Sequence, residues 1–329
     1  MNTDSGEFKS VVLALLVYLI PSGVTTMQAE TLTYAERLGW PSGTRAVIFH
    51  VDDVGMSHDS NRGAAIAMEE GIATSMSIMM PCPWVSETAK WLEENTSLDA
   101  GIHLTLTSEW KNYRWGPVAN PSAVAGLLDP HGYLYAKVMD VALHATPDEV
   151  ETEMRAQVDK ALAMGIRPTH LDSHMGTCFQ PAYVERYIKL GVEKKIPVLI
   201  FGGHLQHIGA EAGAMKPLVR ALAEQVWQAG LPVLDDLVTQ PTHAKEYDQR
   251  KEELTALLRQ MQPGVTQIIL HCTDPSETFH AISGSGPARH AEMLLMTDPD
   301  IRAVIAEEKI VLTTWRELQE RRARVGDTP

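Results

Sequence analysis

Cysteine is scarce in this chain of 329 residues. Only three are present, Cys82, Cys178 and Cys272, and no two of them are spaced as a CxxC pair. Three cysteines are too few for a disulfide framework, and without a CxxC pair a structural zinc ribbon is excluded. A hydrophobic core must stabilise the fold, and 44% hydrophobic with 21% charged residues is typical of a globular enzyme.

Positive charge is also in short supply. The chain has 28 lysine and arginine residues against 42 aspartate and glutamate residues, for a formal net charge of -14. Because such a chain repels phosphate backbones, we expect no nucleic-acid partner. The acidity itself indicates little more than solubility.

The apolar run at residues 11–20 (VVLALLVYLI) is too short to span a bilayer, which takes about 20 apolar residues. It fits the apolar part of a secretory signal peptide over residues 1–29, with cleavage after Ala29. The protein would then be exported, to the periplasm or outside the cell, with no stable membrane span. If Met27 is the true start, no signal exists and the protein stays in the cytoplasm.

Short β-rich runs alternate with longer helical ones, a pattern typical of a mostly parallel sheet. Several runs are apolar throughout, as strands buried on both faces are. We predict strands at 45–51, 75–80, 100–106, 169–172, 197–201, 231–234, 267–271 and 310–312. The predicted helices are 61–70, 147–163, 217–228 and 246–261. The sequence contains no linker and no repeat, so a single α/β domain is expected.

Residues 107–145 lack a clear period and are rich in Gly, Pro and aromatic residues. Long irregular insertions in compact α/β domains often form a wall or lid over a site. Its aromatic residues could stack on sugar rings or simply pack within the segment. They are Trp110, Tyr113, Trp115, Tyr133 and Tyr135.

Aspartate and histidine residues gather where predicted strands end. In chain order they are Asp52 and Asp53, His103, the cluster His170, Asp172 and His174, and finally His271. The carboxyl ends of parallel strands meet at one edge of a sheet, where α/β proteins bind their ligands. These side chains are therefore expected to converge on one pocket.

Each group taken alone has a less specific explanation. A single histidine in a strand is usually a hydrogen-bonded core residue, and paired acids after a strand often cap the next helix. The cluster of two histidines and one aspartate at 170–174 is the sharper signal, although only one histidine need face a metal. Together the groups predict a metal site with open coordination positions, best suited to Zn²⁺, with Mn²⁺, Co²⁺ or Mg²⁺ as alternatives. A second carboxylate beside the ligand could act as a base, which favours metal-assisted hydrolysis.

Five segments in order resemble the YdjC-like carbohydrate deacetylases, the family of chitooligosaccharide deacetylases, which is distantly related to polysaccharide deacetylases. They are HVDDVGMSHDSNRG (50–63), GIATSMSIMMPCP (71–83), GIHLTLT (101–107), PTHLDSHMG (168–176) and ARHAEMLLMTDPDIRAVIAEEKIVLTTWREL (288–318). The resemblance implies a distorted (β/α) barrel of the polysaccharide-deacetylase-like type over residues 44–318. A lead-in at 30–43 would precede it and a tail at 319–329 would follow.

The resemblance also implies the roles of individual residues. One divalent cation, Zn²⁺ or Mg²⁺, would be held by Asp53, His103 and His174. Asp52 would be the general base and His271 the catalytic histidine of a late strand. The residues expected around them are His170, Asp172 and Arg289. In the alternative arrangement His170 is the ligand and His174 points outward.

The implied reaction is hydrolysis of N-acetyl groups on N-acetylated oligosaccharides, with release of acetate. Two alternatives stay open: a metal-dependent hydrolase of another amide or ester, and a carbohydrate-binding barrel without activity. The sequence does not decide between a monomer and a homodimer.

Two departures from the family pattern lie beside the predicted site. Further histidine usually follows Asp-Ser-His, where this chain has Met175, and Pro-Gly usually follows the late histidine, where it has Cys272. The second change and Cys178 place two thiols near site histidines. We therefore predict that Cys178 and Cys272 lie close together and form a disulfide if the protein is exported.

Overall fold

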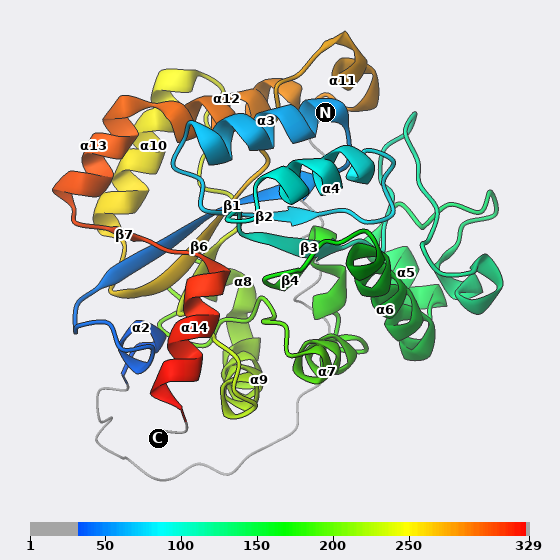
Figure 1. Ribbon diagram of the computed structural model, residues 1–329, viewed down its shortest axis with the longest axis horizontal. Helices are drawn as coiled ribbons and strands as arrows, with labels where there is room; N and C mark the ends of the chain where they lie inside the picture. Colours follow the sequence, from blue (N-terminus) through cyan, green and yellow to red (C-terminus); the bar gives the residue numbers. More distant parts are fainter. Residues whose placement is uncertain (1–31, 327–329) are drawn as a thin grey trace.

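A single parallel sheet forms the centre of the computed structural model, which describes residues 32–326 (Figure 1). The predicted signal peptide thus lies outside the described residues. The strands are β1 (Arg45–Val54), β2 (Ser75–Ile78), β3 (Ala100–Leu104), β4 (Leu171–Ser173), β5 (Asp236–Val238), β6 (Gly264–Leu270) and β7 (Val311–Leu312). Their order is β4-β3-β2-β1-β6-β5, and β7 pairs with β1.

The sheet curls into a ring. Residues 197–201, predicted as a strand, contribute two parallel bridges, Leu171 with Val198 and Phe201 with Leu234. These bridges connect β4 to the segment that leads into β5, and β5 pairs with β6. The result is the distorted (β/α) barrel that the family resemblance implies. The predicted strand at 231–234 is reduced to a single bridge, and regular pairing begins only at Asp236.

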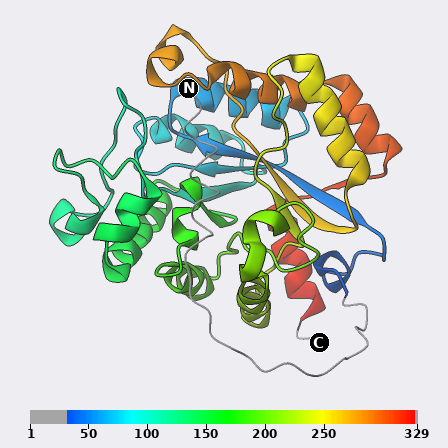
Figure 2. The same ribbon diagram turned by 180° about the vertical axis from the view of Figure 1, so that it is seen from behind.

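Helices surround the barrel (Figures 1 and 2). The longer ones are α3 (His58–Glu69), α4 (Val85–Glu94), α6 (Pro147–Ala163), α7 (Val184–Lys194), α9 (Lys216–Gln228), α10 (Tyr247–Gln260), α12 (Gly286–Thr297), α13 (Pro299–Glu307) and α14 (Trp315–Val325). The short ones are α2 (Tyr34–Arg37), α5 (Val138–His144), α8 (Gly209–Ala212) and α11 (Glu277–Ile282). Single 3₁₀ turns occur at Pro121–Ala123, Ala125–Leu127 and Gly213–Met215, and a longer one at His174–Phe179. None of the helices in residues 32–326 is long and apolar enough to cross a membrane.

Capping residues explain why one predicted helix has the correct first residue and another begins earlier than predicted. Helix α6 has the predicted bounds, because Thr146 and Glu149 form a reciprocal capping box and Pro147 occupies the first turn. Helix α3 starts three residues earlier than predicted. Its N-cap is Ser57, whose hydroxyl accepts a hydrogen bond from the backbone N–H of Ser60.

The segments at both ends of the described chain pack against the barrel. The backbone N–H groups of Tyr34 and Ala35 donate to the buried carboxylate of Asp235, at 2.9 and 3.1 Å. At the other end Trp315 is fully buried, and its Nε1 donates to Gln267. Helix α14 continues past residue 318, where the sequence places the end of the domain.

The irregular segment is anchored on helix α6. The carboxylate of Glu153 accepts hydrogen bonds from the backbone N–H groups of Val118 and Ala119, at 2.9 and 2.8 Å. Residues 107–137 contain no strand and no α-helix, whereas the last part of the predicted irregular segment forms α5, because residues 138–144 are helical. Buried polar contacts of this kind fix an otherwise irregular backbone beside the barrel.

Candidate active site

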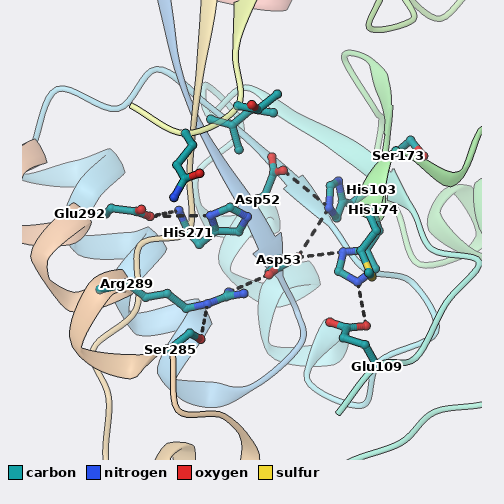
Figure 3. Close-up of a pocket in the computed structure, with 16 residues that line it drawn as sticks. Asp52, Asp53, His103, Glu109, Ser173, His174, His271, Ser285, Arg289 and Glu292 are labelled. Carbon is teal, nitrogen blue, oxygen red and sulfur yellow. Dashed lines mark hydrogen bonds and ion pairs between the residues drawn. The ribbon is translucent and has the colours of Figure 1, made fainter. Parts of the chain in front are cut away.

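A pocket opens at the carboxyl ends of the strands (Figure 3). All three predicted metal ligands and both predicted catalytic residues line it. The lining residues are Asp52, Asp53, His103, Glu109, Ser173, His174, Met175, Gly176, Thr239, Gln240, Ile269, His271, Ser285, Ala288, Arg289 and Glu292.

The end of β1 explains how two adjacent acids reach the same pocket. Neighbouring residues of a regular strand point to opposite faces. Here the pairing of β1 with β2 is irregular between Val51 and Val54, and Asp53 has a left-handed backbone with φ 64°. Aspartate tolerates this conformation better than most residues. The irregularity turns both Asp52 and Asp53 into the pocket.

Asp53, His103 and His174 form a compact buried group. Asp53 Oδ1 lies 3.5 Å from His103 Nε2 and 3.2 Å from His174 Nδ1. One ligand atom from each residue lies within 4.8 Å of the others. The three residues come from β1, β3 and the turn after β4, so the barrel brings together positions far apart in sequence.

The outer nitrogen of each imidazole faces a carboxylate. His103 Nδ1 lies 2.8 Å from Asp172 Oδ1, and His174 Nε2 lies 3.1 Å from Glu109 Oε2. Metal-binding histidines are commonly held in this way, because the outer carboxylate fixes the ring and its tautomer. The contacts also raise the pKa of His174 well above its usual value: burial alone would lower it, but Glu109 and Asp53 outweigh burial.

The donor set fits a divalent cation. Two imidazole nitrogens and one carboxylate oxygen are ligands that Zn²⁺ takes readily. Asp53 Oδ1 accepts no well-directed hydrogen bond within residues 32–326, although it is buried. Two other buried groups could hold a cation, His50–His170–Asp172 and Asp52–His103–Asp172, but His50, His170 and Asp172 do not line the pocket. The group formed by Asp53, His103 and His174 is therefore the candidate metal centre.

Arg289 contacts the other oxygen of Asp53. Its guanidinium lies 2.6 Å from Asp53 Oδ2, and its Nε donates to the hydroxyl of Ser285. Burial alone would raise the pKa of Asp53, but the charges of Arg289 and His174 hold it well below its usual value. The charge of Arg289 thus favours the ionised form of the Asp53 carboxylate.

Asp52 lies beside this centre. Its Oδ2 is 3.7 Å from His103 Nε2, and its Oδ1 is 3.2 Å from His50 Nε2. The residue is 7% exposed and lines the pocket. A carboxylate in this position can exchange a proton with a water molecule in the pocket.

His271 faces the centre from the side of β6 (Figure 3). A third of its side chain, 33%, is exposed, and its Nδ1 lies 3.7 Å from Glu292 Oε2. Burial and the charge of Arg289 lower the pKa of His271, but Glu292 and Asp53 outweigh them, so the net shift is upward. A histidine with a raised pKa is suited to donate a proton.

His170 lies apart from the pocket. Its ring stacks on Trp315 at 5.1 Å between centroids, and the side chain is fully buried. Burial, followed by the charge of His50, lowers the pKa of His170 well below its usual value. Of the two histidines in the cluster at 170–174, the structure brings His174 to Asp53 and His103, and packs His170 in the core.

Residues 46–307 match the YdjC-like protein family. The chain belongs to the YdjC-like family. This confirms the resemblance carried by the sequence motifs.

Named relatives of this YdjC-like protein are deacetylases. It is 30% identical to a carbohydrate deacetylase of Thermus thermophilus over 288 residues, 87% of this chain and 97% of the relative. It is 29% identical to a chitooligosaccharide deacetylase of Yersinia enterocolitica over 162 residues, 47% of this chain and 59% of the relative. A crystal structure from Enterococcus faecalis V583, of a protein suggested to cleave cellobiose phosphate, has a TM-score of 0.70. It covers 84% of this chain and 99% of its own at 21% identity, and supports the fold.

Three titratable residues in or beside the pocket were not predicted from the sequence: His50, Glu109 and Glu292. Glu109 lies in the irregular segment, 65 residues from the histidine that it contacts, and no local pattern marks it. Glu292 could have been predicted from the sequence, because residues three apart on a helix share a face and Arg289 was already a candidate. His50 stands two residues before Asp52 and therefore on the same side of β1.

The predicted disulfide is wrong: Cys178 and Cys272 are both free and buried. Cys178 follows β4, and its Sγ lies 3.7 Å from Met154 Sδ. Cys272 follows β6. In the sheet order β3, β2 and β1 separate β4 from β6. The two cysteines thus follow strands on opposite sides of the ring, although each is close in sequence to a site histidine.

The aromatic residues of the irregular segment pack against one another and against the residues around the pocket. The Arg289 guanidinium carbon lies 5.7 Å from the centre of the Trp110 ring, and the ring centroids of Trp115 and His174 are 6.4 Å apart. None of the five lines the pocket. Trp115 is buried with its Nε1 donating to the carbonyl of Thr107, and the Tyr113 hydroxyl donates to the carbonyl of Met56. Tyr135 stacks on His144. The structure favours packing for Trp110, Tyr113, Trp115 and Tyr135, whereas Tyr133 is 40% exposed and stays a candidate for contact with a sugar.

Proposed function

We propose that this protein is a metal-dependent hydrolase that removes N-acetyl groups from N-acetylated saccharides and releases acetate. The observation that carries the proposal is the convergence of Asp53, His103 and His174 in one pocket with a second carboxylate, Asp52, and a partly exposed histidine, His271. The relatives named carbohydrate deacetylase support the sugar substrate. The pocket by itself favours attack on a carbonyl group.

Asp53, His103 and His174 would hold one divalent cation, Zn²⁺ or Mg²⁺. A cation in such a site polarises a carbonyl group and acidifies water. Asp172 and Glu109 keep the two imidazoles oriented through their outer nitrogens. Arg289 keeps Asp53 ionised, and the ionised carboxylate is the form that binds a cation.

Asp52 would act as general base and His271 as general acid. Asp52 accepts a proton from the attacking water, because its carboxylate lies at the pocket wall beside His103. His271 donates a proton to the departing sugar nitrogen, because an amine leaves only when protonated. The carboxylate of Glu292 favours the protonated imidazole of His271. It also accepts a hydrogen bond from the backbone N–H of His271 at 2.6 Å.

The test measures acetate released from N-acetylglucosamine oligomers by the full chain, with and without a chelator. We expect the chelator to abolish release and added Zn²⁺ or Mg²⁺ to restore it. Binding of the oligomers without release would instead support a carbohydrate-binding barrel. Release from acetyl esters or non-sugar amides alone would support a hydrolase of another substrate class.

We further propose export, on the evidence of the apolar run at residues 11–20 and the small residue Ala29. Expression of the full chain with N-terminal sequencing of the processed protein tests this. A mature end at Glu30 supports export, and an intact end at Met1 or Met27 contradicts it.

A further inference from the structure

His50 lies under the pocket, in the interior of the barrel. It is fully buried and stands two residues before Asp52 on β1, on the same side of the strand. It does not line the pocket. Any influence that it has on the reaction must therefore act through other side chains.

One nitrogen of His50 contacts three oxygens. Its Nε2 lies 3.0 Å from Asp172 Oδ2, 3.1 Å from Ser77 Oγ and 3.2 Å from Asp52 Oδ1. Its Nδ1 has no hydrogen-bond partner within residues 32–326. The contacts of this ring are thus concentrated at a single atom, which lies within ion-pair distance of two carboxylates, although Asp52 Oδ1 accepts no well-directed hydrogen bond within residues 32–326.

The same two carboxylates lead to the candidate metal centre. Asp172 uses its other oxygen, Oδ1, to contact His103 Nδ1 at 2.8 Å. Ser77 Oγ lies 3.1 Å from the same nitrogen of His103. Asp52, with Oδ1 beside His50, presents Oδ2 toward His103 Nε2. A single imidazole therefore connects the proposed base to the outer side of a proposed metal ligand.

The contacts of His50 compensate two buried carboxylates, Asp52 and Asp172. Asp52, Asp53 and Asp172 are 7%, 1% and 1% exposed, and buried carboxylates are costly unless polar or charged groups compensate them. Arg289 contacts Asp53. His50 contacts the other two, and without it they would face each other's charge with fewer compensating groups.

We propose that His50 is a positioning residue, which holds Asp52 as the base and holds Asp172 against His103. This inference rests on the proposed function for the role of Asp52. Its effect on His103 concerns metal affinity, which can be measured without any substrate.

The test compares His50→Gln, His50→Asn and His50→Leu in the full chain. The side-chain nitrogen of glutamine can reach the place of His50 Nε2, whereas that of asparagine falls short and leucine has none. Two quantities are measured: the Kd of Co²⁺ from its absorption spectrum, and kcat and KM for acetate release. Thermal unfolding of each variant shows whether it is folded.

We expect His50→Leu and His50→Asn to bind Co²⁺ roughly 10-fold to 100-fold more weakly, as loss of outer contacts to a metal ligand usually does. Their kcat should fall by about 100-fold or more, because a displaced base loses most of its contribution, while KM changes little. His50→Gln should recover most of both losses. If leucine does not fold, the comparison of glutamine with asparagine decides.

His170→Gln is the matched control. His170 is equally buried, and its ring lies 4.9 Å from that of His50, but its Nε2 is 3.9 Å from Asp172. We expect this change to lower the Tm and to leave the Kd of Co²⁺ and kcat within about threefold.

The inference is overturned if His50→Leu folds with the wild-type Kd for Co²⁺ and the wild-type kcat, or if glutamine and asparagine behave alike. If the wild type binds Co²⁺ but releases no acetate, the proposed function fails. The effect of His50 on Co²⁺ affinity is then still decided by the same titrations.

Discussion

Buried aspartates lie at both ends of the barrel, and their surroundings differ. Asp235, at the amino end, accepts hydrogen bonds from the backbone N–H groups of Tyr34, Ala35 and Val265, at 2.9, 3.1 and 2.8 Å. Asp53, at the carboxyl end, is contacted by the side chains of His103, His174 and Arg289. Both oxygens of Asp235 accept backbone hydrogen bonds. In Asp53, by contrast, Oδ1 accepts no well-directed hydrogen bond within residues 32–326 and is available to a cation.

The pKa values of the two aspartates move in opposite directions. Burial raises the pKa of Asp235 to about 6, although its backbone hydrogen bonds oppose the shift. Burial acts on Asp53 as well, but there the charges of Arg289 and His174 prevail. Burial alone therefore does not identify a functional carboxylate; the kind of partner does.

Replacing Asp53 should have the largest effect on activity. Asp53→Asn removes the ligand charge and leaves Arg289 without this partner, so we expect loss of the bound cation and a fall in kcat/KM of about 1,000-fold or more. Lewis-acid catalysis contributes several kcal/mol, and about 1.4 kcal/mol corresponds to tenfold. Metal content by elemental analysis and acetate release measure the two effects.

The matched control is Asp235→Asn at the other end of the barrel. It should lower the stability of the fold by about 1–3 kcal/mol, because an amide cannot satisfy all three N–H donors. Metal content should be unchanged. If Asp235→Asn loses the metal as Asp53→Asn does, the distinction between the two ends is wrong.

Asp52→Asn should come next in size. We expect kcat to fall by roughly 100-fold to 10,000-fold, the usual contribution of a general base, with the metal retained. Acetate release and elemental analysis on the same sample test this. Loss of the metal from this variant would show that Asp52 is a ligand instead of the base.

Glu292→Gln should have the smallest effect, on pH dependence. The carboxylate of Glu292 raises the pKa of His271, and a general acid is active only while protonated, so activity should fall as pH rises through that pKa. Without Glu292 the pKa drops, and the alkaline limb of the kcat profile should move to lower pH. An unchanged limb would exclude His271 as the group that titrates there.

Much of the architecture followed from local signals in the sequence. Helix α6 was bounded correctly by Thr146 and Pro147, because a cap and a proline act locally. The segments at 197–201 and 231–234 were harder, because their pairing is limited to single bridges that depend on the curvature of the ring. Periodicity does not carry that information.

The site was predictable where its residues follow strands. Asp52, Asp53, His103 and His271 were placed by the rule that strand ends meet at one edge. The residues alone left the choice between His170 and His174 open, because it depends on where this short strand begins and ends: His170 precedes β4 and packs in the core, whereas His174 follows β4 and reaches the pocket. Glu109 depends on how an irregular segment folds back, and the cysteine pairing failed because nearness in sequence to the site is not nearness in space.

Helix α12 carries the two charged residues Arg289 and Glu292, which lie three positions apart and both line the pocket. One contacts the carboxylate of Asp53, the proposed metal ligand, and the other lies close to the imidazole of His271. A small rotation or translation of this helix would therefore change the acidity of both groups at once. Substitutions on its outer face, remote from any substrate, could retune the working pH of the enzyme, and directed evolution for activity at a new pH should select changes there.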